Sequence, residues 1–172
     1  MNINIFFTSI IGGLFVIFFL FEPLNIKKQD FGEIPVFELE KFKLIELNEK
    51  GLTTVMDGVK GVRYTDRYIV YNINYTDNTK KYLANMTADE GLYEGDIIDL
   101  TGNIKYSRED GISFSTQEAV YNRKTNIVTS PGKYIAYLGK NKVTGSTIEY
   151  SNVLDTITSK QVTVNYKLKE RK

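Results

Sequence analysis

The sequence predicts an all-β protein built from repeated hairpins, and three observations support this prediction. A tyrosine recurs every 28 or 29 residues, at Tyr64, Tyr93, Tyr121 and Tyr150. A fixed period of this length indicates one supersecondary unit, here a pair of strands, copied several times. From Thr53 onward apolar and polar residues alternate, and turn residues interrupt them about every 8–12 positions. We therefore expect an open trough of antiparallel strand pairs, preceded by a single N-terminal transmembrane helix.

The N-terminal segment is expected to be a membrane anchor. Residues 3–21 contain no charged side chain. At about 1.5 Å per residue this run would span roughly 28 Å as a helix, close to the hydrocarbon thickness of a bilayer. A cleaved signal peptide is the alternative, but there is no basic n-region and no small-residue cleavage site. We predict an anchor over residues 1–24 and a β domain over residues 25–172.

The composition excludes several classes of function. The 172 residues include no Cys and no His, so the catalytic triads and most zinc or iron sites that depend on these side chains cannot form. A net charge of +1 with scattered Lys and Arg argues against a nucleic-acid partner. Neither a calcium-loop motif nor a phosphate-cradling glycine motif occurs. We therefore expect neither a metal nor a cofactor.

Carboxylates are the remaining acid–base groups. Glu109 with Asp110, or Asp96 with Asp99, could in principle supply the pair that a glycosidase requires. The first pair lies in a predicted hairpin turn, and Asp99 alternates outward. We therefore expect that the protein is not an enzyme.

The first predicted strand lies within residues 34–47. Phe37 and Leu39 share one face, whereas Phe42 and Leu44 share the other. A β-bulge near Lys41 would reconcile the two phases. A helix is the competing interpretation, because Glu, Lys and Leu all favour helices.

Two long strands and a hairpin follow. Strict alternation over residues 68–75 predicts one shared face for Ile69, Tyr71, Ile73 and Tyr75. Alternation over residues 96–106 directs a second set inward, namely Ile98, Leu100, Ile104 and Tyr106. Arg108–Gly111 is a hairpin signal before the strand that contains Phe114.

The C-terminal third predicts shorter strands. Residues 126–129 lead into a turn at Ser130–Gly132, and residues 134–138 lead into a turn at residues 139–141. The last strand places four apolar side chains on one face, Val162, Val164, Tyr166 and Leu168. Its unpaired backbone groups could accept a strand from another chain, although a frayed tail is the alternative.

The four periodic tyrosines are expected to be structural. A ligand-stacking role is conceivable, but we favour a repeated hairpin corner at which each ring packs and each hydroxyl pairs with the backbone.

Three segments resemble the LptC family, the membrane-anchored periplasmic components of lipopolysaccharide export. Residues 100–106, LTGNIKY, are similar to the family's Leu-x-Gly-x-Val strand. Residues 110–122, DGISFSTQEAVYN, resemble its Asp-Gly hairpin and Thr-x-x-Ala/Leu-x-Tyr strand. Residues 143–150, VTGSTIEY, are similar to the next repeat. The region around residues 37–47 matches only in its apolar pattern.

The resemblance implies a V-shaped, open β-jellyroll whose apolar groove holds lipid acyl chains. Our candidates for this groove are Ile69, Tyr71, Ile73, Ile98, Leu100, Ile104, Phe114, Val162 and Val164. It implies that an N-terminal edge, with candidates Phe37, Leu39 and Phe42, docks the permease subunits of an ABC transporter. It also implies that a C-terminal edge, with candidates Val164, Tyr166 and Leu168, docks a soluble periplasmic bridge protein.

The resemblance also implies an inner-membrane, single-pass protein with its domain in the periplasm. Lys27 and Lys28 by themselves would favour the opposite orientation. The leading hypothesis is a non-enzymatic protein that passes lipopolysaccharide from an ABC transporter to a bridge protein. A membrane-tethered β-scaffold that contacts only protein partners is the alternative. An anchored polysaccharide enzyme that uses Glu109 or Asp110 ranks third.

Overall fold

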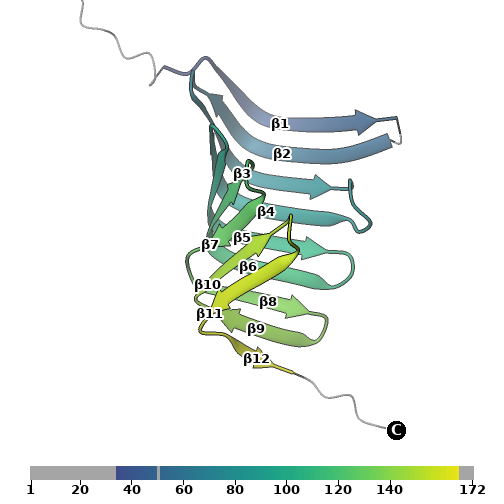
Figure 1. Cartoon of the computed structure of the whole chain (residues 1–172). Coiled ribbons are helices and arrows are strands. Elements are labelled where there is room, and N and C mark those ends of the chain that lie inside the picture. The colour runs from purple at the N-terminus through teal and green to yellow at the C-terminus, as the bar shows by residue number, and fades with distance from the viewer. Residues whose placement is uncertain (1–33, 50, 167–172) are drawn as a thin grey trace, which may run out of the picture. The chain divides into compact units, whose positions relative to one another are not determined.

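The structure, a computed structural model, describes residues 34–49 and 51–166. All of them belong to one unit of the chain, Gly32–Lys172. They form antiparallel β-strands in a single open sheet, which confirms the all-β prediction (Figure 1). The predicted anchor lies outside the described residues. Within them, no helix has the length and apolar character that crossing a membrane requires.

The strands form a meander, in which chain neighbours are usually sheet neighbours. The sheet order is β1-β2-β3-β4-β5-β6-β7-β10-β11, and β8, β9 and β12 extend it from β6. The first predicted strand is confirmed as a strand over Phe37–Asn48, and the competing helix is not formed. The bounds are β1 (Phe37–Asn48), β2 (Gly51–Arg63), β3 (Arg67–Asp77), β4 (Ala84–Glu94), β5 (Ile97–Arg108), β6 (Ile112–Asn122), β7 (Ile127–Ser130), β8 (Tyr134–Leu138), β9 (Asn141–Gly145), β10 (Thr147–Ser151), β11 (Thr156–Lys160) and β12 (Thr163–Asn165).

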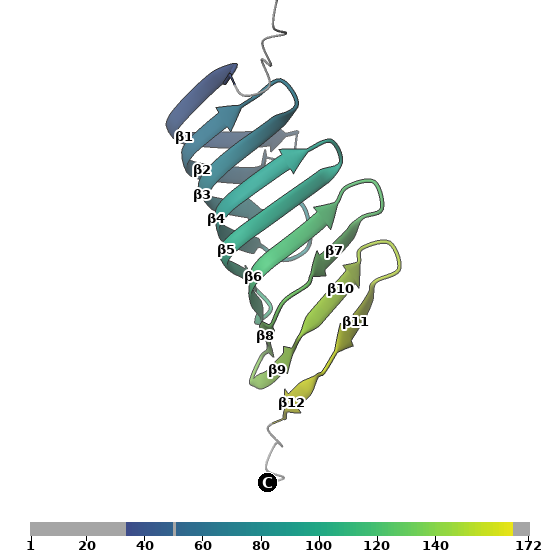
Figure 2. The same cartoon turned by 90° about the vertical axis from the view of Figure 1, so that its left-hand side faces the viewer.

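A crease divides the sheet into two half-sheets, and the long strands β1 to β6 bend across it (Figure 2). Beyond β6 the chain is interrupted at the crease. β7 pairs with residues 120–122 of β6, whereas β8 pairs with residues 112–115. The predicted turn at Ser130–Gly132 does not connect a hairpin. It separates β7 from β8, which both pair with β6. β10 and β11 continue the first half-sheet beside β7, and β9 and β12 continue the second beside β8.

Left-handed backbone conformations mark the crease in several strands. Lys41 in β1 has φ 49°, Asn72 in β3 has 52°, and Asn103 in β5 has 46°. A residue in this conformation interrupts the regular alternation of side chains between the two faces of a strand. The bulge predicted near Lys41 is not found, because Glu40 pairs with Lys60 and Phe42 with Gly58 in one continuous register. The left-handed conformation of Lys41 changes the phase instead, and it brings Phe37, Leu39 and Phe42 onto one face.

A left-handed residue in β3, Asn72, makes one prediction wrong, namely that Ile69, Tyr71, Ile73 and Tyr75 share one face. Ile73 belongs to the buried core cluster, and Val70 packs against that cluster. Ile69 and Tyr71 alternate with Val70 along β3, so they point to the opposite face. Asn72 lies inside the strand in the left-handed conformation, which asparagine tolerates. The alternation of side chains therefore changes phase between Tyr71 and Ile73.

The core is thin and lies along the crease. Ile73, Ala88, Ile104 and Ala119 form its buried cluster, and half-buried residues from both half-sheets pack against it, namely Met56, Val70, Tyr75, Met86 and Leu100. We call the side of the sheet that carries this cluster the inner face. Because the cluster is small, most apolar side chains of the inner face are only partly covered by the described protein.

Candidate functional site

A row of mostly aromatic side chains crosses the inner face of the first half-sheet. Each residue is the direct cross-strand partner of the next, and Ile98 lies two positions from the core-packed Leu100 on the same strand face. We call this the tyrosine row, and it consists of Phe37, Arg63, Tyr68, Tyr93, Ile98, Tyr121, Val128, Tyr150 and Ile157.

A second row crosses the inner face of the other half-sheet. Met56, Tyr75 and Met86 are consecutive members, and all three pack against the core cluster. We call this the methionine row, and it consists of Leu44, Met56, Tyr75, Met86, Tyr106, Phe114, Ala136, Val143 and Val164. With strands about 4.8 Å apart, each row spans roughly 38 Å.

Both rows are half-buried in the middle and exposed at their ends. Phe37 and Ile157, the ends of the tyrosine row, are 43% and 66% exposed, and Leu44 and Val164 are 50% and 56% exposed. Apolar surface that stays at least partly exposed over many strands is unusual on a monomeric soluble protein and indicates a binding surface.

Protein side chains fill the floor of the crease. A Cβ atom built on Gly58 would lie 2.6 Å from the Phe42 ring, and one built on Gly91 would lie 2.5 Å from Ile73 Cδ1. The inner face is therefore closed next to the crease, and the two rows are the apolar surface that remains beyond it.

Among the C-terminal strands, hydrogen bonds connect the two half-sheets across the crease. Tyr134 of the second half-sheet is buried, and its hydroxyl shares a 2.7 Å hydrogen bond with the Ser159 hydroxyl of the first. Ser159 in turn donates to the Thr147 carbonyl at 2.7 Å. Thr116 and Ser130, both buried, share a 2.7 Å hydroxyl–hydroxyl bond. The relative position of the two half-sheets is thus set by polar contacts here and by apolar packing elsewhere along the crease.

Three of the four periodic tyrosines belong to the tyrosine row. Tyr121 donates to Asn126 Oδ1 and Tyr150 to Asp155 Oδ1, each at 3.0 Å, and Tyr93 is bonded to Arg123. The predicted hydroxyl-to-backbone pairing is therefore wrong, because the partners are turn side chains.

Tyr64 differs from the other three. It lies in the turn after β2, where its backbone N–H donates to the Arg67 carbonyl at 2.8 Å. The row member of that hairpin is Tyr68, four residues later. The period marks a repeated unit, but its first tyrosine is not equivalent to the others.

The predicted groove residues separate by face. The inner face carries Ile73, Ile98, Leu100, Ile104, Phe114 and Val164. Ile69 and Tyr71 lie on the opposite face, and Val162 precedes β12. Sequence reasoning missed Met56, Met86 and Val143, because only the cross-strand register identifies them as row members.

Both predicted edges are edges of the described sheet. In the described chain β1 pairs only with β2, and all its side chains except Phe42 are exposed. At the other end, β11 pairs with β10 and β12 with β9. Tyr166 is 68% exposed and follows the end of β12, so the predicted last strand is shorter than expected. Leu168 lies outside the described residues.

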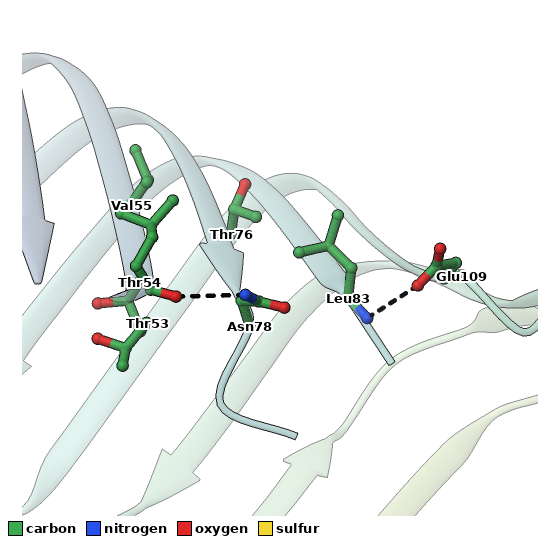
Figure 3. A pocket seen from close by; sticks show the side chains of 8 residues that line it. Thr53, Thr54, Val55, Thr76, Asn78, Leu83 and Glu109 are labelled. Carbon is green, nitrogen blue, oxygen red and sulfur yellow. Dashed lines mark hydrogen bonds between the residues drawn. The ribbon is translucent and has the colours of Figure 1, made fainter. Parts of the chain in front are cut away.

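A shallow hollow of about 260 Å³ lies at the margin of the second half-sheet (Figure 3). Its lining mixes polar and apolar side chains and includes no member of either row: Leu52, Thr53, Thr54, Val55, Thr76, Asn78, Leu83 and Glu109. Glu109 accepts a hydrogen bond from the Leu83 N–H at 3.4 Å, so this carboxylate joins two turns. Among the described residues no group of acidic side chains could hold a metal ion.

A family model described as "Lipopolysaccharide-assembly, LptC-related" matches residues 10–167. No curated protein matches the chain.

Proposed function

The chain belongs to the LptC family and so has a role in lipopolysaccharide transport, and we propose that it acts there as a non-enzymatic lipid conduit. In this proposal it accepts lipopolysaccharide from an inner-membrane ABC transporter and passes it to a soluble periplasmic bridge protein. Residues 1–24 anchor it in the inner membrane, and the β domain lies in the periplasm.

The two apolar rows of the inner face carry the proposal. Each buried CH₂ group contributes about 0.8 kcal/mol, so an acyl chain with ten methylenes half covered would gain roughly 4 kcal/mol. The rows run across the strands from one sheet edge to the other. A chain held along them could therefore move from edge to edge without leaving apolar surface, which suits transfer better than storage.

The two edges of the sheet supply the proposed protein contacts. The exposed backbone of β1, with Phe37 and Leu39 beside it, would receive the permease subunits of the transporter. The β11 and β12 edge, with Val164 and Tyr166, would receive the bridge protein by strand addition. A partner sheet added at either edge would lengthen both rows.

The carboxylates in the turns support a non-enzymatic role. Asp110 accepts two hydrogen bonds from the Arg108 guanidinium, at 2.9 and 2.8 Å, and this pairing holds the pKa of Asp110 below its ordinary value. A general acid needs the opposite shift. Glu109 contacts the backbone of a neighbouring turn, so both groups act as turn residues.

Site-specific photo-crosslinking tests the conduit. A photoreactive residue at Ile98 or Phe114, both on the inner face, should capture lipopolysaccharide. Matched positions on the opposite face are Asp99, the neighbour of Ile98, and Thr163, the neighbour of Val164. Crosslinks from Asp99 and Thr163 with none from the inner face would exclude the conduit.

The filled crease favours one other function, a tethered scaffold that contacts only proteins. Phe42, Ile73 and Tyr134 already pack the floor against glycines, so the domain has a core without any lipid. A scaffold would melt at the same temperature with and without lipopolysaccharide, whereas a lipid-binding protein is stabilised by its ligand.

A further inference from the structure

Two arginines lie near one end of the tyrosine row, Arg63 as a member of the row and Arg123 beside it, and both contact aromatic rings. The Arg63 guanidinium carbon lies 5.9 Å from the Phe37 ring centroid and 5.2 Å from that of Tyr68. The Arg123 guanidinium carbon lies 5.4 Å from the Tyr93 ring centroid, and Arg123 also hydrogen-bonds the Tyr93 hydroxyl. Each contact over a ring face is attractive because the ring quadrupole is negative there.

The two arginine sites are joined. Tyr68 and Tyr93 are cross-strand partners, and their rings stack at a centroid distance of 5.8 Å and an interplanar angle of 27°. Arg63 ends β2 and Arg123 follows β6, so both cations lie at the rim of the first half-sheet, where the strands turn. We call Arg63, Tyr68, Tyr93 and Arg123 the Arg–Tyr cluster.

The charges of the cluster are not neutralised. In the described part of the chain neither Arg63 nor Arg123 takes part in an ion pair, whereas Arg67 pairs with Asp66 at 3.1 Å and Arg108 with Asp110 at 2.8 Å. A guanidinium stacked on a ring still directs its N–H groups outward in its own plane, and this fork matches a phosphate. Two such forks at the end of an apolar row form a surface that is cationic at one side and apolar at the other.

We propose that the Arg–Tyr cluster binds the phosphate groups of a phosphorylated amphiphile whose acyl chains lie along the tyrosine row. This inference rests on the proposed lipid-conduit function and names the contact for the headgroup. The row continues from Tyr93 directly to Ile98 and Tyr121, so a headgroup at the cluster places its acyl chains on apolar side chains. The stacked rings restrain the arginines before the ligand arrives, which reduces the entropy lost on binding.

Binding of two matched lipids to the full-length chain in detergent micelles tests the site. One probe is a multi-acylated disaccharide lipid with two phosphates, and the other is the same lipid without them. The wild-type chain should prefer the phosphorylated lipid by roughly tenfold for each guanidinium that contacts it. The R63Q/R123Q double variant should lose this preference and bind the two lipids with equal affinity.

Lys60→Gln is the matched control. It removes the same charge from β2, three residues before Arg63, but Lys60 pairs with Glu38 at 3.1 Å and lies beside Tyr71 on the opposite face. The preference should survive this change. Arg63→Lys keeps the charge but removes the fork and should lower the preference in part. Unchanged melting temperatures would show that the variants fold.

The possible outcomes separate the two proposals. If R63Q/R123Q keeps the preference, the cluster is not the headgroup contact, while the conduit stands. If the wild-type chain binds neither lipid, both proposals are wrong. If inorganic phosphate displaces the phosphorylated lipid at concentrations equal to those of the lipid, the cluster is a site for free anions instead of a lipid headgroup.

Discussion

The hydroxyl of Tyr121 donates a 3.0 Å hydrogen bond to the side-chain oxygen of Asn126, five residues further along the chain. Asn126 lies in the turn between β6 and β7 and has φ 56°. The hydroxyl of a strand residue therefore hydrogen-bonds a turn residue that has the left-handed conformation. Tyr150 repeats this relationship with Asp155, which has φ 50° in the turn between β10 and β11. Tyr121 and Tyr150 therefore stabilise the turns that follow them, and their rings also belong to the tyrosine row.

Tyr121→Phe is expected to destabilise the domain by about 1 kcal/mol, the usual contribution of one hydrogen bond. The change removes only the hydroxyl, so the row keeps its ring. Chemical denaturation measures the difference in the free energy of unfolding. Tyr137→Phe is the control, because no described residue hydrogen-bonds the Tyr137 hydroxyl; an equal loss in both variants would contradict a specific role for the Tyr121–Asn126 bond.

The phenol of Tyr150 should ionise above its ordinary pKa of 10.0, because burial raises this pKa and the bond to Asp155 raises it further. A raised pKa means that the associated stability is fully present below pH 10.0 and is lost as the pH rises through the higher value. Phenolate absorbance, taken as the difference between wild type and Tyr150→Phe, gives this pKa. Asp155→Asn should lower it toward 10.0, and an unchanged pKa would show that Asp155 does not contribute.

Gly145→Ala is expected to destabilise the domain by about 1–3 kcal/mol, the range for overpacking. The added Cβ would lie 2.6 Å from Cε1 of Tyr134, whose ring is buried, stacked on Phe114 at 5.5 Å and bonded to Ser159. The ring therefore has little room to move. Thermal unfolding provides the comparison with Gly132→Ala, since a Cβ at Gly132 would meet no atom within 4 Å. Equal melting temperatures for the two variants would contradict the tight contact at the crease.

The carboxyl group of Asp110 should titrate below its ordinary pKa of 3.8, because the Arg108 guanidinium is bonded to its charged form. The stability from a lowered pKa is present above pH 3.8 and is lost as the pH falls through the lower value. The NMR shift of the Asp110 carboxyl carbon reports this titration. Arg108→Gln should raise the pKa toward 3.8, whereas Arg67→Gln, which changes an arginine at the start of β3, should leave it in place.

The first and third strands show how far alternation alone can be followed. Around Lys41 the apolar residues Leu39 and Phe42 are out of phase, so the change of phase is visible in the sequence. Its cause is the left-handed conformation of Lys41 and not the predicted bulge, because the register with β2 does not shift there. In β3 the outward-facing Ile69 and Tyr71 are as apolar as the inward-facing Ile73. The sequence pattern therefore shows no break at Asn72, and the predicted shared face is wrong.

Local chemistry by itself determined the strands, the Arg108–Gly111 hairpin, the repeat and the family, because alternation and turn residues act within a few positions of the chain. Only the tertiary structure decided which side chains form the two rows, how the half-sheets meet at Tyr134 and Ser159, and that Arg63 and Arg123 flank one stacked pair of tyrosines. These relationships depend on the register between strands. Register is set by hydrogen bonds and packing between residues distant in sequence, so no short segment of the chain contains it.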